Sequence, residues 1–322
     1  MNSQLIYLSL EDLHKKVPEE FFGVIDVALK PYFSSIKSSN IYWISEPESK
    51  KDLQTYADII QFFLNRKIQR SSTLYVIGGG ATSDLGGFVA STILRGINWI
   101  VVPTTLLSMV DASIGGKVGV NHDMGKNLIG SFYTPQEILI NTDFLKSLPV
   151  SERKSGEGEI LKYALLNSTI ADLIMSSVSL EKIILACSEH KLQVVARDFL
   201  EMSERKTLNL GHTIGHGLEK LLSLPHGVSV VFGMILELDL IEDNLAVERL
   251  RALALKLGWT TDELKIPSLT SLQKNELKRF VSSDKKRSGN EISMTSLQNG
   301  KPEIIKISVT SIEKFIDDNF NH

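Results

Sequence analysis

The chain has 322 residues, of which 43% are hydrophobic and 23% are charged, and its formal net charge is -3. This composition is typical of a globular protein with room for two domains of ordinary size. The small negative charge gives no general attraction to nucleic acid or to an anionic membrane, so an anionic ligand would need a local cluster of Lys and Arg. We find neither a run of about 18 apolar residues nor a signal peptide, and we expect a cytoplasmic protein. The single cysteine, Cys187, excludes an intrachain disulfide.

The first part of the chain alternates strand-like and helix-like segments. Short runs rich in β-branched and aromatic residues predict strands at 41–45, 74–77, 99–102 and 137–140. Apolar residues at helical spacing predict helices at 53–64 and from Asp84 to about Leu94. Strands that alternate with helices indicate βαβ units and a mainly parallel sheet. We therefore predict a Rossmann-like α/β domain over residues 1–146.

The pattern changes after about Lys146, and glycine-rich segments become rare. Helical spacing predicts helices at 152–166, 180–202, 213–222, 229–246 and 248–257. A hairpin is predicted at 291–307, with Asn299-Gly300 at its turn. The second domain, over residues 147–322, is thus expected to be mostly α-helical.

A glycine segment, Gly78-Gly79-Gly80, follows the predicted strand at 74–77 and opens the next helix. Glycines let the backbone approach a pyrophosphate, and a helix N-terminus offers N–H groups and a positive dipole end. A tight turn in which Ser83 or Asp84 caps the helix explains the same residues equally well.

Hydroxyl and charged residues near the next strand favour the first interpretation. Thr104 and Thr105 follow the strand at 99–102, at the end where α/β sheets bind ligands. Asp111 and Lys117 then flank a second pair of glycines. Together, these segments favour a dinucleotide site.

Three histidines and one glutamate indicate a metal site. His212 and His216 lie four residues apart and therefore on one helical face, and His226 follows them. Glu159 lies on the predicted helix at 152–166. Two imidazoles and a carboxylate suit a catalytic zinc or a similar ion with an open coordination position. The spacing does not decide which two of the three histidines bind.

Basic residues recur beside these motifs, and they are Arg95, Lys117, Lys126, Lys162, Lys191, Arg205, Lys285 and Lys286. A single lysine is most often a solvated surface charge. Several cations near a metal in a chain of negative net charge indicate a substrate with more than one negative group, such as a carboxylate and a phosphate.

These motifs resemble the 3-dehydroquinate synthase family from about residue 47 to residue 290, with order and spacing kept. The most specific segment is Asn-Leu-Gly-His-Thr-Ile-Gly-His at 209–216. The other matching segments are 78–88, 94–96, 103–107, 111–121, 125–130, 155–163, 224–227 and 284–286. The chain departs from the family pattern at Ala28, Gly158 and Val228.

The resemblance implies a dehydroquinate synthase-like fold, in which an NAD-binding α/β domain precedes a mostly helical metal- and substrate-binding domain. It implies zinc or cobalt bound by Glu159, His212 and His226. It places NAD against Asp26, Glu48, Lys51, Gly79, Gly80, Asp84, Thr104, Thr105, Asp111 and Lys126. It assigns substrate binding and proton handling to Arg95, Lys117, Asn127, Lys162, Lys191, Arg205, Asn209, His216 and one of Lys285 or Lys286.

The activity that the resemblance implies is the conversion of 3-deoxy-D-arabino-heptulosonate 7-phosphate, a phosphorylated sugar acid, to 3-dehydroquinate and phosphate. This is a step of the shikimate pathway to chorismate and the aromatic amino acids. The implied chemistry is that of a lyase: transient oxidation by NAD, phosphate elimination, re-reduction, ring opening and intramolecular aldol closure. In this family the counterpart of Arg95 reaches the partner's site, so we expect a homodimer.

Three other functions compete with this one. Another sugar phosphate cyclase, of the 2-deoxy-scyllo-inosose synthase type, would act on a substrate without a carboxylate and would not need Lys191, Arg205 and Asn209. A metal-dependent NAD alcohol or glycerol dehydrogenase would release NADH and would not need so many cations. A non-catalytic scaffold would be expected to lose a metal ligand or a site lysine.

Overall fold

The computed structural model describes residues 3–34, 36, 38–283, 290–298 and 300–320 of the chain. The chain divides into two compact units, unit 1 from Met1 to Pro149 and unit 2 from Val150 to His322. No helix in the described ranges is long and apolar enough to cross a membrane.

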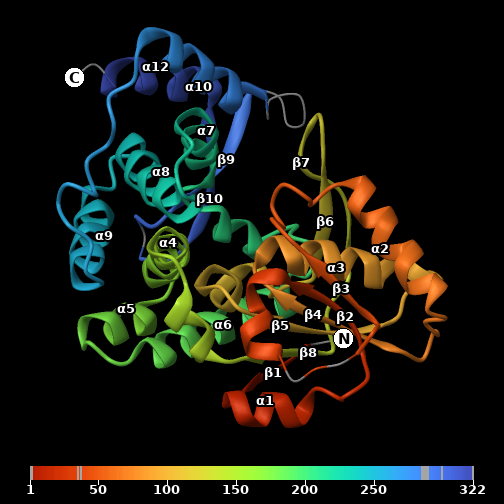
Figure 1. Cartoon of the computed structure of the whole chain (residues 1–322). Helices are drawn as coiled ribbons and strands as arrows, with labels where there is room; N and C mark the ends of the chain where they lie inside the picture. The colour runs from red at the N-terminus through yellow and green to blue at the C-terminus, as the bar shows by residue number, and fades with distance from the viewer. Residues whose placement is uncertain (1–2, 35, 37, 284–289, 299, 321–322) are drawn as a thin grey trace. The chain divides into compact units, whose positions relative to one another are not determined.

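Unit 1 is built on a six-stranded sheet in which neighbouring strands pair in parallel. The strands are β1 (Gln4–Tyr7), β2 (Phe22–Asp26), β3 (Ile41–Ile44), β4 (Thr73–Gly78), β5 (Asn98–Pro103) and β8 (Glu137–Ile140), in the spatial order β1-β8-β5-β4-β2-β3. The central strands β4 and β5 are rich in branched apolar residues and almost wholly buried, as parallel strands covered on both faces require. Figure 1 shows these strands side by side with helices around them.

Helices, short helical turns and one hairpin connect these strands. The helical segments are α1 (Leu10–Lys16), η1 (Val27–Phe33), α2 (Leu53–Asn65), α3 (Gly80–Thr92), η2 (Ile93–Arg95), η3 (Ser108–Ala112) and η4 (Thr142–Ser147). Between β5 and β8, β6 (Lys117–His122) and β7 (Gly125–Phe132) form an antiparallel hairpin outside the main sheet. Because α3 packs against both β4 and β6, the helix that follows the glycine segment is anchored to the sheet and to the hairpin.

The predicted α/β fold of this unit is confirmed, but only part of its strands were predicted. The strands at 41–45, 74–77, 99–102 and 137–140 correspond to β3, β4, β5 and β8. The strands β1, β2, β6 and β7 were not predicted. β7 is largely exposed and contains two glycines, so it lacks the apolar run or the alternation that identifies a strand.

Unit 2 is mostly helical, as predicted. Its elements are α4 (Val150–Leu166), α5 (Ser168–Met175), α6 (Leu180–Arg197), η5 (Glu204–Asn209), α7 (His212–Leu222), α8 (His226–Leu240), α9 (Asn244–Lys256), α10 (Ser271–Ser283), β9 (Glu291–Ser296), β10 (Glu303–Ser308) and α12 (Val309–Asn319). The antiparallel pair β9 and β10 confirms the predicted hairpin, although Asn299 at its turn lies outside the described residues. Ile214, Phe232, Leu277 and Ile312 belong to the apolar core that α7, α8, α10 and α12 share.

Two predicted helices extend too far. The helix predicted at 180–202 ends at Arg197, because Asp198 leaves helical geometry and its carboxylate accepts the backbone N–H of Met202 at 2.9 Å. The helix predicted at 229–246 ends at Leu240, and the separate helix α9 then begins after Asp243, which caps it. Apolar spacing continues across both breaks, whereas the aspartate side chains offer the backbone a competing hydrogen bond. Helices α1, α5, α10 and α12 were not predicted.

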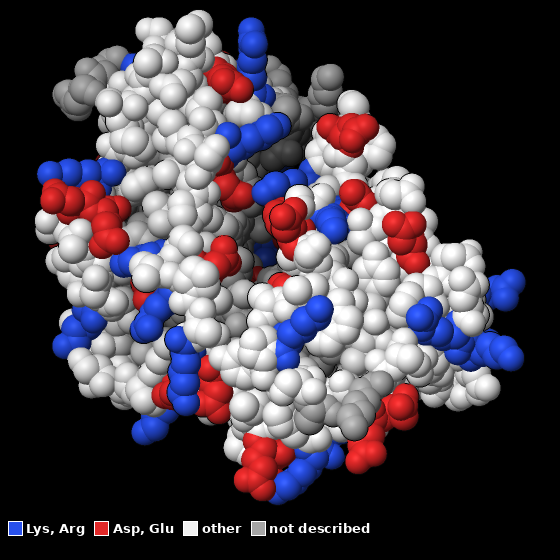
Figure 2. Space-filling model, viewed as in Figure 1, with Lys and Arg blue, Asp and Glu red and all other residues white. Residues whose placement is uncertain are grey.

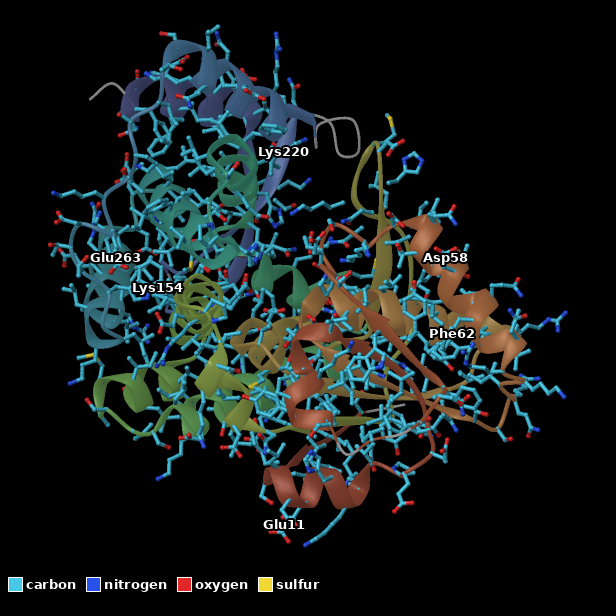
Figure 3. The ribbon with its side chains drawn as sticks, viewed as in Figure 1. Glu11, Asp58, Phe62, Lys154, Lys220 and Glu263 are labelled. Carbon is cyan, nitrogen blue, oxygen red and sulfur yellow. The ribbon has the colours of Figure 1, made fainter. Side chains whose placement is uncertain are left out.

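Helix α4 lies at the centre of unit 2 and packs against α5, α6, α8 and α9. Every residue from Ser155 to Leu165 is buried, so the charged side chains in this stretch have to be neutralised within the protein. Near the start of the helix, Lys154 pairs with Glu263 at 3.3 Å (Figure 3). Farther along, Glu159 and Lys162 form the charged part of the candidate site.

Glycines let α8 approach α4 until the two backbones touch. A Cβ built at Gly158 would lie 2.2 Å from the carbonyl oxygen of Gly227, so any side chain at residue 158 would push the helices apart. Gly158 directly precedes Glu159, and Gly227 directly follows His226. The close crossing therefore sets the separation of two candidate metal ligands.

Candidate functional site

Five of the residues predicted to bind the dinucleotide lie along one edge of the parallel sheet of unit 1. Asp26 ends β2, Gly79 and Gly80 follow β4, and Thr104 and Thr105 follow β5. Because the strands are parallel, their carboxyl ends meet at this edge, where open α/β sheets bind ligands. The side chain of Asp26 caps η1 there, accepting the backbone N–H of Ala28 at 2.9 Å.

The glycine segment turns directly from β4 into α3. Gly79 is the N-cap residue and α3 begins at Gly80, so the alternative in which Ser83 or Asp84 caps the helix is wrong. Gly79 has no side chain that could cap the helix, and a Cβ there would lie 3.0 Å from Cγ2 of Thr105. The first backbone N–H groups of α3 can therefore be offered to an anion such as a pyrophosphate.

A second cluster in unit 1 joins Lys51, Asp84 and Asn127. The buried ammonium of Lys51, which follows β3, forms an ion pair with Asp84 and donates to Oδ1 of Asn127 at 2.5 Å. This cluster links the first turns of α3 to the hairpin strand β7. Lys126 and Glu48 form a weaker, exposed ion pair at 3.7 Å.

Three other predicted residues of unit 1 lie on separate elements. Asp111 lies in η3, Lys117 begins β6, and Arg95 ends η2. Leu94 and Arg95 both have positive φ angles, of 50° and 67°. Consecutive left-handed residues other than glycine cost conformational energy and are typical of functional sites. Arg95 is exposed on this strained turn at the end of α3.

In unit 2, Glu159, His212 and His226 converge from α4, α7 and α8. One potential ligand atom of each lies within 4.8 Å of the other two. Oε1 of Glu159 is 3.4 Å from Nε2 of His212 and 3.0 Å from Nε2 of His226. The ligand atoms of a tetrahedral zinc site lie about 3.3 Å apart when the bonds are about 2.0–2.1 Å long. The observed separations suit such an ion.

Hydrogen bonds at Nδ1 aim the Nε2 atoms of both imidazoles at Glu159. Nδ1 of His212 lies 3.1 Å from the carbonyl oxygen of Leu210, so this nitrogen carries the proton and donates. Nδ1 of His226 donates to Oε2 of Glu219 at 2.9 Å. An Nε2 atom that faces a carboxylate in this way has to carry a proton or share a metal cation with it, because two lone pairs would repel each other. The residues therefore fit a divalent ion.

A second group of potential ligands overlaps with the first. His216, Glu219 and His226 also bring their ligand atoms within 4.8 Å of one another. The side chain of Glu159 is only 1% exposed, whereas that of Glu219 is 20% exposed. A buried carboxylate needs a cation more strongly, because water cannot stabilise its charge. The group that contains Glu159 is thus the better candidate for a metal site, in which Glu219 would orient His226.

The electrostatics of the cluster favour positive charge at its centre. Burial by itself would raise the pKa of Glu159, but Lys162, His212 and His226 hold that pKa well below its ordinary value. Burial would lower the pKa of His226, whereas hydrogen bonds to Glu159 and Glu219 raise that pKa to about 10. The raised pKa means that the carboxylates of Glu159 and Glu219 stabilise a positive charge at His226. A divalent ion can supply that charge in place of the proton.

Three cations of unit 2 that were predicted to bind the substrate are buried. Lys162, Lys191 and Arg205 are 2%, 7% and 3% exposed, and they come from α4, α6 and η5, which pack against one another. On the face that Figure 2 shows, by contrast, Lys and Arg are interspersed with Asp and Glu. Buried cations attract an anion more strongly than exposed ones, because neither water nor salt screens them fully.

The remaining predicted residues of unit 2 lie at the margin of the cluster. The ring of His216 is 5.0 Å from that of His212, between centroids. Asn209 is exposed at the end of η5 and donates to Oε1 of Glu201 at 2.8 Å. Lys285 and Lys286 lie outside the described residues.

Two carboxylates that contact the candidate metal site or its helices were not predicted from the sequence. Glu219 lies seven residues after His212 and three after His216, so helical spacing places it on the same face and could have identified it. Glu237 interrupts the apolar run of α8, which is a recognisable signal. Burial raises the pKa of Glu237 to about 7, although hydrogen bonds from backbone N–H groups at the start of α7 oppose the shift.

Family models described as 3-dehydroquinate synthase N-terminal and C-terminal match residues 41–155 and 156–287. The chain belongs to the 3-dehydroquinate synthase family. A 3-dehydroquinate synthase from Staphylococcus carnosus (strain TM300) is 36% identical over 293 residues, which cover 87% of this chain and 81% of the relative. One from Staphylococcus aureus (strain MRSA252) is 34% identical over 302 residues, which cover 87% and 84%.

A solved structure extends the similarity to the fold. It is a 2-deoxy-scyllo-inosose synthase in complex with carbaglucose-6-phosphate, NAD+ and Co2+, with a TM-score of 0.83 and 25% identity, and the alignment covers 98% of this chain and 96% of the other. This similarity confirms the predicted dehydroquinate synthase-like fold.

Proposed function

We propose that this chain is a 3-dehydroquinate synthase that converts 3-deoxy-D-arabino-heptulosonate 7-phosphate to 3-dehydroquinate and phosphate. The observation that carries the proposal is the convergence of Glu159, His212 and His226 in the unit that also holds the buried cations Lys162, Lys191 and Arg205. A divalent ion with several buried cations suits a substrate that bears both a carboxylate and a phosphate. The relatives that bear this enzyme's name, at 36% and 34% identity, support the same activity.

Two cofactors follow from this proposal. Glu159, His212 and His226 would hold zinc or cobalt. The residues that would hold NAD lie in unit 1, and they are Asp26, Glu48, Lys51, Gly79, Gly80, Asp84, Thr104, Thr105, Asp111 and Lys126. When bound, NAD supplies a reversible hydride acceptor and the metal supplies Lewis acidity towards a substrate oxygen. The solved synthase that holds NAD+ and Co2+ supports this pair of cofactors.

The side chains of this protein orient the substrate and stabilise its charge. Arg205 and Lys191 hold the carboxylate, because a guanidinium offers two parallel hydrogen bonds to its two oxygens. Lys162, which pairs with Glu159, lies where a substrate hydroxyl can approach the metal ligands. Asn209 completes the carboxylate site, and the phosphate and the other hydroxyls are bound by Arg95, Lys117, Asn127 and one of Lys285 or Lys286. These cations and amides stabilise the negative charge that grows on the phosphate oxygen as the C–O bond breaks. His216 accepts and returns a proton at its imidazole.

The test of the activity is phosphate release from the heptulosonate phosphate in the presence of NAD and zinc or cobalt, with NADH absorbance followed in the same sample. We expect phosphate release without net NADH, because the oxidised intermediate is reduced again within one turnover. Accumulating NADH would instead indicate a dehydrogenase. A protein that released no phosphate from this substrate would not be a 3-dehydroquinate synthase.

The second candidate is another sugar phosphate cyclase, because a solved 2-deoxy-scyllo-inosose synthase has this fold, with a TM-score of 0.83. A hexose 6-phosphate lacks the carboxylate, so its binding would bring no anion to Lys191 and Arg205. The same assay with a hexose 6-phosphate separates the two functions. We expect no phosphate release above the metal-free background.

We also propose that the enzyme is a cytoplasmic homodimer in which Arg95 acts in the partner's site. Mixing Arg95→Ala and His212→Ala chains, each inactive alone, should then restore up to about a quarter of wild-type activity, since half of the dimers are hybrids with one intact site. Refolding the mixture and assaying phosphate release checks this. No restored activity in proven hybrids would mean that Arg95 acts within its own chain.

A further inference from the structure

Glu237 is a buried carboxylate on α8 that reaches the start of α7. Its side chain is 2% exposed. Oε2 accepts the backbone N–H of Gly211 at 2.8 Å, and Oε1 accepts that of Ile214 at 2.9 Å. These N–H groups lie on either side of His212, the first residue of α7. One carboxylate thus binds the backbone before and after a candidate metal ligand.

The first turn of α7 depends on this carboxylate, because the N-cap residue is Gly211, which has no side chain to act as a cap. Glu237 supplies from another helix the acceptor that a Ser or Asp N-cap would supply, and its charge complements the positive end of the helix dipole. Gly233 keeps the two helices close enough for this contact, since a Cβ there would lie 1.9 Å from the carbonyl oxygen of Gly211.

We propose that Glu237 is a positioning residue for the metal centre, which holds the first turn of α7 in the geometry that points Nε2 of His212 at Glu159. The imidazole of His212 donates from Nδ1 to the carbonyl oxygen of Leu210 at 3.1 Å. Leu210 directly precedes the anchored Gly211, so a shift of this turn moves the ring and its acceptor together. The inference rests on the proposed metal site and adds a residue that acts on the ion only through His212.

Asp243 provides a matched control in the same unit. It is buried and caps α9, because its Oδ1 accepts the backbone N–H of Ala246 at 3.2 Å. Helix α9 carries none of the candidate site residues. Loss of either carboxylate removes a helix cap and should destabilise the folded protein, whereas only the loss of Glu237 should alter metal binding.

The experiment titrates Co2+ into the metal-free full-length wild type, Glu237→Gln and Asp243→Asn proteins. A pH of about 8 keeps Glu237 ionised, since this lies above its pKa of about 7. The visible absorption of bound cobalt reports affinity and ligand geometry, and urea unfolding reports stability. In Glu237→Gln the amide NH2 would face a backbone N–H, so one of the two flanking hydrogen bonds is lost.

We expect Glu237→Gln to weaken cobalt binding about 10- to 100-fold and to shift the visible bands, while Asp243→Asn stays within about twofold of the wild type. Unchanged affinity and bands in a folded Glu237→Gln protein would overturn the positioning role and leave the metal site standing. A wild type that bound no cobalt would overturn the metal site and the positioning role together. If Glu237→Gln does not fold, Glu237→Asp, which keeps the charge on a shorter side chain, is judged by the same two criteria.

Discussion

Glutamine in place of Glu159 is expected to weaken zinc binding by about a thousandfold, whereas glutamine in place of Glu219 should weaken it by only about 10- to 100-fold. An oxygen of Glu159 meets the Nε2 atoms of His212 and His226, at 3.4 and 3.0 Å, and would bind the ion directly. Glu219 contacts Nδ1 of His226, on the far side of the ring. Both substitutions remove one negative charge from the same cluster. A larger loss of zinc affinity in Glu159→Gln than in Glu219→Gln therefore reflects the loss of a metal ligand and not the loss of charge.

Zinc affinity in competition with a chromophoric chelator measures this difference, and phosphate release should fall in parallel with metal content. His212→Ala should behave like Glu159→Gln. If Glu219→Gln lost more affinity than Glu159→Gln, the ion would belong to the group formed by His216, Glu219 and His226. If the His212→Ala protein still bound nearly one metal ion per chain, His212 would not be a metal ligand.

Leucine in place of Arg205 is expected to lower kcat/KM for the carboxylated substrate about a hundredfold or more, while the dissociation constant of NAD stays nearly unchanged. Arg205 is buried, and its Nη1 donates to the carbonyl oxygen of Phe199 at 2.6 Å, so the guanidinium is already held in one orientation. A group held in this way loses little side-chain entropy when it binds a carboxylate. NAD affinity should persist because its proposed residues belong to unit 1.

Arg279, exposed on α10, offers a control for the same change of residue type. We expect Arg279→Leu to keep kcat/KM within about twofold, because an isolated surface charge contributes little. Steady-state kinetics and NAD titration of both variants complete the test. Unchanged turnover in Arg205→Leu would count against a role in binding the carboxylate. A large loss of NAD affinity would indicate a general disturbance of the fold.

Local sequence was sufficient for four strands of the main sheet, although not for β1 and β2, and insufficient for the hairpin, whose two strands depend on each other. The strands β3, β4, β5 and β8 appear as short apolar runs, because a strand covered on both faces has to be apolar almost throughout. The hairpin strands β6 and β7 carry glycines, charges and exposed residues, and their conformation depends on pairing with each other. The ends of α6 and α8 were misplaced because Asp198 and Asp243 act through hydrogen bonds to backbone groups several residues away or in the next helix.

Motifs in the chain were enough to recognise the family and to select Glu159 and two of three histidines as candidates for the metal site. The packing of the helices was needed to show that Nε2 of His212 and Nε2 of His226 face Glu159. The contacts of Glu219 with His226 and of Glu237 with the start of α7 likewise depend on how the helices pack. Spacing along the chain says which residues share a helical face, whereas the separation between faces depends on how closely α4, α7 and α8 pack. The backbones of α4 and α8 touch at Gly158 and Gly227, and this contact sets the separation of the two helices. The sequence pattern of one helix does not predict such a distance.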